Sequence, residues 1–463
     1  MKDDKFSISA SIKNLKKTVI LGHTISIDSR IRNINIIENL IDNNKLEIIN
    51  SLYSDLGKSK IEALSEILLV KQEISLVKNK LRLWMRPKNI NPPFYYFPSS
   101  SKILFEPLGC VLVLGPYNYP FLYIFKPLVN IFSAGNTALI KPSEKCPSTS
   151  KLIKKLCDKY FPKEILLALE GGYKKAEALV KENFDHIFFT GSSKTGKSIM
   201  KSAANNLTPL TLELSGTNPV IILKNANLKI AAKRIVWGKF FNSGQSCMAP
   251  NHLFVEKSIL QQLIIEIKNS ILEFYGNNPI NSDNLSKLEN TQYARTLQIL
   301  KNSKNNNKLI YGGKYSKKKL KISPTLLKVK NEKDPLIMGE IFGSLLPIMA
   351  IDNHKKAIEI IQNTPKPLAI YIFGGNRNIH KKITKLTSSG TICINDVMLP
   401  VLIPNLPFGG VGLSGMGKFH GEEGFKTFSN QKTITKKSNF LDINLRYPPY
   451  NNLSKLINMI FKI

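Results

Sequence analysis

The feature that most constrains the fold of this chain is a repeated alternation of apolar runs with longer segments. The runs CVLVLG, NTALIKP, HIFFTGS and NPVIIL are rich in β-branched or aliphatic residues, and each is separated from the next by a segment that can carry a helix. Parallel strands covered by helices on both faces have this pattern, because neither face of the strand meets water. The sequence therefore predicts a doubly wound α/β sheet.

A second alternating series follows Glu213. Its expected strands are HLFVEK, KLIYGG, PLAIYIFGG and TICINDV, again separated by helical stretches. A chain of 463 residues is well beyond the size of one hydrophobic core, so two or more domains are expected. The second series predicts a second α/β unit over most of the chain after Glu213.

The segment before the first strand has a different character. Between Ile25 and Trp84 apolar residues recur at helical spacing, and Gly57 offers a stop between two helices. The segment NPPFYYFPSSS then breaks the pattern and predicts an extended connection or ribbon. The expected apolar stripe of the second helix consists of Ile61, Leu64, Leu68, Ile74, Val77 and Leu81.

The chain is strongly basic, with 66 Lys and Arg against 33 Asp and Glu and a formal net charge of +33. Such a balance raises nucleic-acid binding as a remote alternative function. The lysines are spread along the whole chain, however, and Lys, Asn and Ile, which all have A/T-rich codons, are abundant together. Genome composition is the favoured reason for the charge, so no specific nucleic-acid partner is expected.

The five cysteines lie far apart and form no CxxC pair, which argues against a disulfide framework or a zinc site and favours a reducing compartment. The polar N-terminus lacks the pattern of a secretory signal, and no apolar stretch approaches the roughly 20 residues of a membrane span. We expect a soluble, cytoplasmic protein. The C-terminal segment LSKLINMIFKI predicts a docked helix or a weak contact with a membrane surface.

Three polar side chains stand out as candidates for chemistry. Cys247 lies in FNSGQSCMAP, a polar loop between a helical run and the strand HLFVEK. Glu213 lies in the apolar strand of TLELSGTNP, where burial raises a carboxyl pKa, and Asn118 lies in PYNYP after CVLVLG. Taken singly, each has a structural alternative: a buried small thiol, a salt-bridged glutamate and a turn asparagine. The loop alone does not say whether it lowers the thiol pKa from its usual value.

A phosphate-binding loop is indicated by HIFFTGSSKTGKSI, in which a strand leads through Gly191, Ser192 and Gly196 into a helix. Backbone amides and the positive helix end would face a pyrophosphate there. From Gly191 to Ser198 the letters also match the P-loop pattern GxxxxGKS, which is a competing interpretation. A P-loop, however, would give Cys247, Glu213 and Asn118 no shared role in one reaction.

Together these motifs resemble the aldehyde dehydrogenase superfamily, and within it the class 3 branch of dimeric enzymes. The resemblance covers nearly the whole chain. Its motifs stand in the family's order: EPLGCVLVLGPYNYPF, AGNTALIKPSE, FTGSSKTG, LELSGTNP, FNSGQSCMAP, EIFGSLLP, and LPFGGVGLSGMGKFHGEEGFKTFS followed by RYPPY.

The resemblance implies a role for each candidate. Cys247 resembles the catalytic nucleophile, Glu213 the base that activates water, and Asn118 the amide that holds the oxyanion with the Cys247 backbone N–H. NAD or NADP is the implied cofactor, and no metal is implied. The implied cofactor contacts are Lys141 and Glu144 at the adenine ribose, Gly191, Ser192 and Gly196 at the pyrophosphate, and Glu340 and Phe342 at the nicotinamide ribose and ring.

The resemblance also implies an organisation for the chain. A Rossmann-type cofactor-binding domain would comprise residues 1–85 and 102–212, and an α/β catalytic domain residues 213–428. Residues 86–101 and 429–450 would form a small β bridging element in a homodimer, with a tail at 451–463.

The implied reaction is oxidation of an aldehyde to the carboxylic acid through a thiohemiacetal and a thioester on the cysteine. The alternative is an acylating relative that passes the thioester to coenzyme A or phosphate. The chain departs from the family pattern at Tyr117, Ser215, Thr217, Ser344 and Leu413.

Overall fold

The computed structural model describes residues 2–442, 447–450 and 453–461. By their internal contacts these residues form two units. The first comprises Met1–Trp84 and Pro107–Ser429, and the second comprises Met85–Glu106 and Asn430–Ile463.

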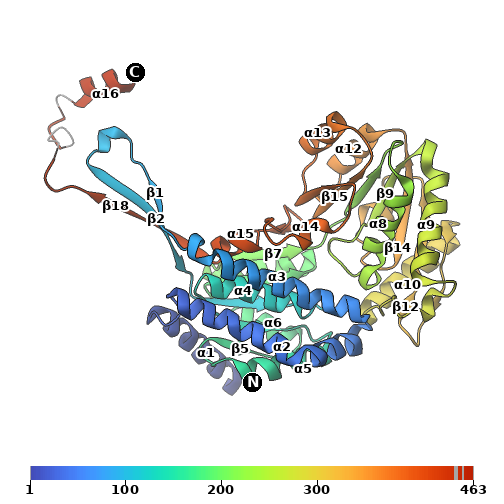
Figure 1. Ribbon diagram of the computed structural model, residues 1–463, viewed down its shortest axis with the longest axis horizontal. Coiled ribbons are helices and arrows are strands. Elements are labelled where there is room, and N and C mark those ends of the chain that lie inside the picture. The colour runs from blue at the N-terminus through green and yellow to red at the C-terminus, as the bar shows by residue number, and fades with distance from the viewer. Residues whose placement is uncertain (1, 443–446, 451–452, 462–463) are drawn as a thin grey trace. The chain divides into compact units, whose positions relative to one another are not determined.

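The first unit contains a six-stranded sheet in the order β17-β7-β6-β3-β4-β5. Its strands β7 and β5 are labelled in Figure 1. All neighbouring strands are parallel except β17, which runs antiparallel to β7. The chain moves outward from β3 in both directions, so the carboxyl ends of β3 and β6 flank the switch point at which doubly wound sheets bind ligands. The strands are β3 (Cys110–Leu114), β4 (Thr137–Lys141), β5 (Leu166–Ala168), β6 (His186–Gly191), β7 (Leu210–Leu214) and β17 (Gly415–Met416).

Helices pack on both faces of this sheet. On one face, α1, α6 and α7 bury a cluster that includes Leu15, Leu112, Phe184 and Ile199. On the other face, α4 packs on β3 and β4, and α2 and α3 pack on α4. The helices are α1 (Lys2–Ile20), α2 (Ile27–Leu56), α3 (Lys60–Trp84), α4 (Leu122–Ser133), α5 (Pro147–Tyr160), α6 (Tyr173–Val180), α7 (Ser193–Ala203) and α15 (Gly421–Thr427).

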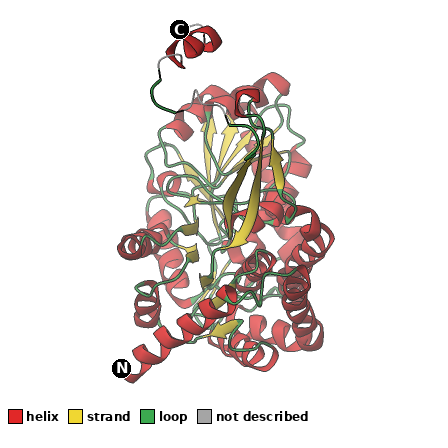
Figure 2. Ribbon diagram, turned by 90° about the vertical axis from the view of Figure 1, so that its left-hand side faces the viewer, coloured by secondary structure: helices red, strands yellow, loops and turns green. Residues whose placement is uncertain are grey.

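A second, seven-stranded sheet has the order β10-β13-β14-β9-β8-β15-β16 and is parallel except for β10. Figure 2 shows strands of the sheets between layers of helices. The strands are β8 (Pro219–Ile222), β9 (His252–Glu256), β10 (Leu309–Tyr311), β13 (Thr325–Val329), β14 (Leu345–Ile351), β15 (Ala369–Phe373) and β16 (Thr391–Ile394), with a separate hairpin of β11 (Tyr315–Ser316) and β12 (Lys321–Ile322). The helices are α8 (Leu228–Phe240), α9 (Leu260–Tyr275), α10 (Asn290–Asn305), α11 (Pro335–Met338), α12 (His354–Gln362), α13 (Arg377–Leu386) and α14 (Leu399–Leu402).

The second unit is a three-stranded sheet in the order β1-β2-β18, followed by a short helix. The segment NPPFYYFPSSS, predicted as an extended ribbon, lies between β1 and the start of β2, which pair antiparallel. Its elements are β1 (Lys88–Ile90), β2 (Ser99–Pro107), β18 (Ser429–Lys437) and α16 (Leu453–Phe461).

The predicted doubly wound α/β fold is confirmed, and every run singled out in the two series is a strand of the first unit. The run NPVIIL, expected in the first series, is however β8 of the second sheet, because it pairs with β9 and β15. Gly57 ends α2 with a φ of 58°, as the predicted stop requires. The predicted apolar stripe of α3 is wrong in part, because Ile61 is 71% exposed and Leu68 is 55% exposed. The buried face of α3 instead carries charged residues, among them Glu62 and Glu66.

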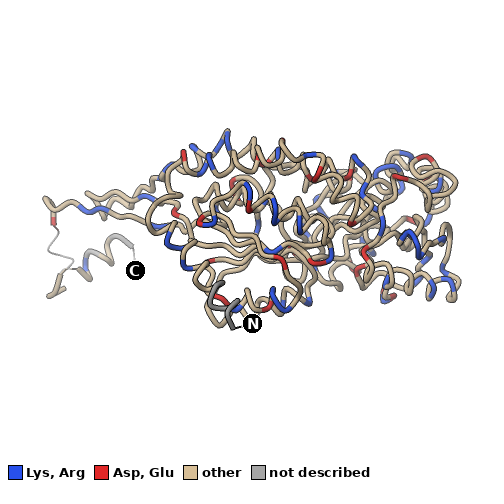
Figure 3. Tube along the Cα trace, turned by 90° about the horizontal axis from the view of Figure 1, so that it is seen from below, with Lys and Arg blue, Asp and Glu red and all other residues tan. Residues whose placement is uncertain are grey.

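Within the described residues, every helix is too short or too polar to cross a membrane. Lys and Arg are distributed over most elements of the chain in Figure 3, as the sequence indicated.

Candidate functional site

A cleft of about 550 Å³ lies in the first unit, and its walls come from both large sheets. One wall is formed where β3, β4, β6 and β7 end, and the other by the loops that precede β9 and β14. Because β9 and β14 are parallel neighbours, the segments that enter them lie side by side. Nine of the ten predicted site residues line this cleft: Asn118, Lys141, Glu144, Gly191, Ser192, Glu213, Cys247, Glu340 and Phe342.

The loop that carries Cys247 has an unusual backbone. After α8, the residues Asn242, Ser243 and Gly244 have successive φ values of 51°, 54° and 79°, in the left-handed region that non-glycine residues avoid. A Cβ added at Gly244 would lie 2.4 Å from the carbonyl oxygen of Gly343. Backbone strain of this kind persists only where the surroundings hold it, so the loop is closely fixed.

Cys247 is 9% exposed, and its Sγ lies 3.8 Å from the hydroxyl oxygen of Tyr123. Its carbonyl oxygen accepts a hydrogen bond of 2.6 Å from Asn218 Nδ2. Burial raises the pKa of the thiol to about 12; the Tyr123 hydrogen bond lowers this pKa, and the charges of Glu213 and Glu340 raise it. The site therefore raises the pKa of this thiol and does not lower it.

Glu213 lies in β7 and is 3% exposed. Neither carboxyl oxygen has a hydrogen-bond partner among the described residues. Burial raises the pKa of Glu213 well above its usual value, and the charge of Lys418 partly offsets this. A buried carboxyl with unused oxygens and a raised pKa is suited to accepting a proton from a reactant near neutral pH.

Asn118 is 4% exposed and follows β3. Its Nδ2 donates a hydrogen bond of 3.0 Å to the carbonyl oxygen of Gln245. An asparagine amide carries two N–H groups, and within the described residues the only recorded acceptor is this carbonyl. The second N–H has no acceptor among these residues, and Asn118 lines the cleft.

Two charged side chains, Lys141 and Glu144, end or follow β4 on the wall that also carries Asn118. Lys141 Nζ donates hydrogen bonds to Glu144 Oε2 at 2.5 Å and to the carbonyl oxygen of Pro142 at 3.1 Å. Burial works to raise the pKa of Glu144, but the hydrogen bond from Lys141 and the charges of Lys141 and Lys145 together lower it. A carboxylate paired with an ammonium, with its side chain 44% exposed, can accept hydrogen bonds from hydroxyl groups in the cleft.

The loop after β6 fits a pyrophosphate. Ser192 is the N-cap of α7 and accepts a hydrogen bond of 3.3 Å from the Thr195 amide, so the helix N-terminus opens toward the cleft. At Gly191 an added Cβ would lie 2.4 Å from the Phe189 ring. Gly196 lies inside α7, outside the cleft lining, and an added Cβ there would lie 2.8 Å from a Leu214 methyl group. Gly191 and Ser192 line the cleft in front of the N-terminus of α7, so the residues present fit a dinucleotide, whereas Gly196 permits the close packing of α7 on Leu214.

Glu340 and Phe342 enter the cleft just before β14. Burial raises the pKa of Glu340 to about 7, and a hydrogen bond from Ser215 and the charges of Arg295 and Lys239 lower it from a still higher value. Phe342 has a φ of 50°, and its ring lies 6.2 Å from that of Tyr117 in an edge-on arrangement.

Two departures from the family pattern have local partners. Ser215, where glycine is usual, contributes the hydrogen bond to Glu340. Ser344, where proline is usual, donates a hydrogen bond of 3.1 Å to the carbonyl oxygen of Ser243. The structure gives no account of Thr217 or Leu413.

Sequence reasoning missed a group of charged residues behind the Asn118 and Cys247 loops. Lys58, just before α3, and Glu62 and Glu66, near the start of α3, are buried and contact both loops. Their spacing of four residues was the available signal, but charged residues at that spacing usually face solvent.

A dinucleotide-type sheet edge that faces a buried thiol, carboxyl and amide is typical of dehydrogenases that bond covalently to an aldehyde. Comparison with known proteins agrees with this class. The chain belongs to the aldehyde dehydrogenase family, whose model matches residues 8–434.

Among its relatives, the 4,4'-diaponeurosporen-aldehyde dehydrogenase of Staphylococcus aureus (strain NCTC 8325 / PS 47) is 39% identical over 90% of this chain and 91% of that protein. The dimeric NADP-preferring aldehyde dehydrogenase of Rattus norvegicus is 36% identical over 96% of this chain and 98% of that protein. The substrate-bound structure of Staphylococcus aureus AldH matches with a TM-score of 0.94 and 36% identity, covering 100% of this chain and 99% of the other.

The protein is thus an oxidoreductase that acts on aldehydes with NAD or NADP, similar to the class 3 enzymes. These matches confirm the predicted family and fold and do not favour the acylating alternative.

Proposed function

We propose that the chain oxidises aldehydes to carboxylic acids through a covalent thioester on Cys247, with Asn118 holding the oxyanion and Glu213 activating water. The observation that carries this proposal is the convergence of the three side chains on one cleft from three separate segments. Each is at most 9% exposed, so water does not screen their interactions with a bound aldehyde.

In the first stage, the Cys247 thiol releases its proton to solvent, and the sulfur adds to the aldehyde carbon, which gives the anion of a thiohemiacetal. The negative charge that develops on the aldehyde oxygen is held by the free Asn118 N–H and the Cys247 backbone N–H. When bound, the nicotinamide supplies a hydride acceptor, whose two-electron chemistry leaves a thioester on the sulfur.

In the second stage, Glu213 accepts a proton from a water that attacks the thioester carbonyl. The C–S bond breaks, the carboxylic acid leaves, and the proton returns to the sulfur. The unused Glu213 oxygens and the raised pKa of this carboxyl support the role of base.

For the cofactor, we propose that Lys141 and Glu144 hold the adenine ribose, Gly191 and Ser192 the pyrophosphate, and Glu340 with Phe342 the nicotinamide end, while Gly196 admits the close packing of α7. A carboxylate beside the ribose repels a 2′-phosphate, so Glu144 favours NAD over NADP.

For the substrate, we propose an apolar medium-chain or aromatic aldehyde, since Tyr117, Tyr119, Phe241 and Phe419 belong to the motifs around the cleft.

We also propose a cytoplasmic homodimer, which the name of the dimeric rat relative supports. In this proposal residues 1–85 and 102–212 bind the cofactor and residues 213–428 carry the chemistry. Residues 86–101 and 429–450 bridge the subunits, and the tail at 451–463 docks on the protein or touches a membrane surface. Parts of these last two segments, residues 443–446, 451–452 and 462–463, lie outside the described residues.

The test is a panel of aldehydes assayed with NAD and with NADP in the absence of coenzyme A and phosphate. We expect reduced cofactor and carboxylic acid in equal amounts, fastest with apolar aldehydes. Turnover that requires coenzyme A or phosphate would establish the acylating reaction instead.

A further inference from the structure

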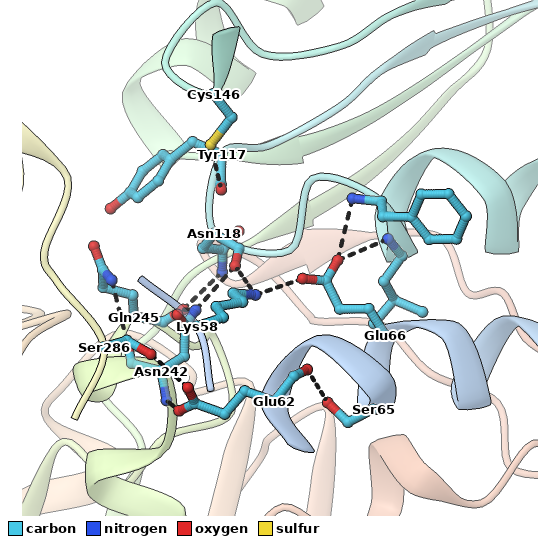
Figure 4. Close-up of polar contacts among 12 residues, drawn as sticks. Lys58, Glu62, Ser65, Glu66, Tyr117, Asn118, Cys146, Asn242, Gln245 and Ser286 are labelled. Atoms are coloured by element: carbon cyan, nitrogen blue, oxygen red, sulfur yellow. Dashed lines mark hydrogen bonds and ion pairs between the residues drawn. The ribbon is translucent and has the colours of Figure 1, made fainter. Parts of the chain in front are cut away.

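A polar cluster lies buried behind the catalytic loops, at the start of α3. Lys58 and Glu66 form an ion pair in which both side chains are 0% exposed, and Glu62 is 4% exposed (Figure 4). Removing such charges from water is unfavourable unless other hydrogen bonds satisfy them. The partners of these side chains therefore show what the cluster holds in place.

Lys58 holds the backbone at the proposed oxyanion residue. Its Nζ donates to the carbonyl oxygen of Asn118 at 2.7 Å and to Glu66 Oε1 at 2.5 Å. The same ammonium lies 4.2 Å from the centre of the Tyr119 ring.

Glu66 holds the other end of the same segment. Its Oε2 accepts hydrogen bonds from the amides of Phe121 at 3.1 Å and Leu122 at 2.9 Å, where α4 begins. The helix has no side-chain cap of its own at Phe121, so Glu66 takes that place. One ion pair thus fixes the backbone within the PYNYP turn, at Asn118, and directly after it, at Phe121 and Leu122.

The Cys247 loop is tied to the same helix turn. Glu62 Oε1 accepts from the Asn242 amide at 2.7 Å, and Asn242 Nδ2 donates to the Asn118 carbonyl at 2.9 Å. The Asn118 side chain donates to Gln245 two residues before Cys247. Figure 4 shows Asn118, Asn242 and Gln245 joined to Lys58 and Glu62 by these contacts.

We propose that Lys58 and Glu66 are positioning residues that fix the side-chain amide of Asn118 relative to Cys247. The proposal rests on the oxyanion role of Asn118 given above. A donor that acts on developing charge stabilises the transition state more than the bound substrate. The pair therefore acts on kcat, with little effect on KM for aldehyde or cofactor.

The test is a double-mutant cycle between the pair and Asn118. Lys58→Met alone leaves a buried carboxylate unpaired, so the working variant is Lys58→Met with Glu66→Gln, whose amide oxygen can still accept from α4. We expect this variant to lower kcat about a hundredfold, since small misplacements of catalytic groups have effects of that size. In an Asn118→Ala background, which itself lowers kcat by about 10² to 10³, the same change has little further effect.

A matched control is a second buried ion pair, which joins α3 to α4. Lys126 of α4 and Glu73 of α3 form a second buried pair at 3.8 Å, with side chains 2% and 0% exposed, and no recorded hydrogen bond joins them to Asn118. We expect Lys126→Met with Glu73→Gln to change the melting temperature and leave kcat unchanged.

The positioning role would be overturned if Lys58→Met with Glu66→Gln lowered kcat by the same factor in the Asn118→Ala background as in the otherwise unmodified enzyme. It would also be overturned if the control, Lys126→Met with Glu73→Gln, lost as much kcat. Both results would leave the oxyanion role of Asn118 intact. If Asn118→Ala alone leaves kcat unchanged, the oxyanion role fails, and the positioning role fails with it.

Discussion

The residues proposed to react and the residues proposed to hold the cofactor differ in how deeply they are buried. Cys247 is 9%, Glu213 3% and Asn118 4% exposed. Glu144 has a side chain that is 44% exposed, and Ser192 caps a helix whose first turn meets solvent. We therefore expect the reacting groups to be fixed in a dry environment and the proposed ribose and phosphate contacts to exchange with water. Changes at the buried reacting groups should have far larger effects.

The largest effect is expected for Cys247→Ala. Removing the nucleophile of a covalent mechanism lowers turnover by several orders of magnitude, because no other group can form the thioester. Cofactor reduction measured by absorbance should fall to background. Cys157→Ala, which removes another buried thiol in α5, is the matched control and should retain activity. Residual turnover near that of the unmodified enzyme would show that a different group attacks the aldehyde.

A pH effect follows from the raised pKa of Cys247. Because burial raises this pKa to about 12, the thiolate fraction should rise about tenfold per pH unit between pH 7 and 9. Alkylation by iodoacetamide, followed by mass spectrometry in protein without added cofactor, should rise accordingly. Cys247→Ala identifies the signal of this thiol. An alkylation rate that levels off below pH 8 would show that the surroundings of Cys247 lower the thiol pKa.

Among the residues proposed to hold the cofactor, Glu144→Gln should lower KM for NADP about fivefold relative to KM for NAD. Two charges about 4 Å apart in water interact by about 1 kcal/mol, which corresponds to that ratio. Steady-state kinetics with both cofactors measure it. Glu47→Gln, at a surface ion pair with Lys155, is the control and should leave the ratio unchanged. An unchanged ratio in Glu144→Gln would remove this carboxylate from cofactor selection.

The smallest effect is expected for Ser192→Ala. Loss of the N-cap of α7 should lower the free energy of unfolding by about 1 kcal/mol, as measured by urea denaturation. Asn227→Ala removes the equivalent cap of α8 and should have a similar effect on stability. Only Ser192→Ala should also raise KM for the cofactor. An equal rise of KM in both variants would show that Ser192 has no role of its own in binding the phosphates.

Much of the fold was predictable because its signals are local. The strands β3, β4 and β6 are continuous apolar runs, and Cys247, Glu213 and Asn118 each follow or end a regular element in a recognisable motif. Parallel pairing then brings strand ends to one edge, so the convergence of distant motifs could be expected.

The buried charges of α3 could not be predicted in this way. A pattern of apolar spacing assigns Ile61 to the core and Glu66 to solvent, whereas the structure has the opposite arrangement. The buried carboxylates of α3 are stabilised by backbone amides far along the chain, at Phe121 and Leu122 for Glu66 and at Asn242 for Glu62. Such partners leave no periodic signal in the sequence of the helix itself.

The central claim is that the sulfur of Cys247, the carboxyl of Glu213 and the amide of Asn118 act together in one cleft. Its most direct test is stopped-flow kinetics of Glu213→Gln, in which thioester hydrolysis should become rate-limiting. We predict a rapid burst of one reduced cofactor per active site followed by a slow steady rate. A linear time course, slowed from the first turnover and without a burst, would contradict the account.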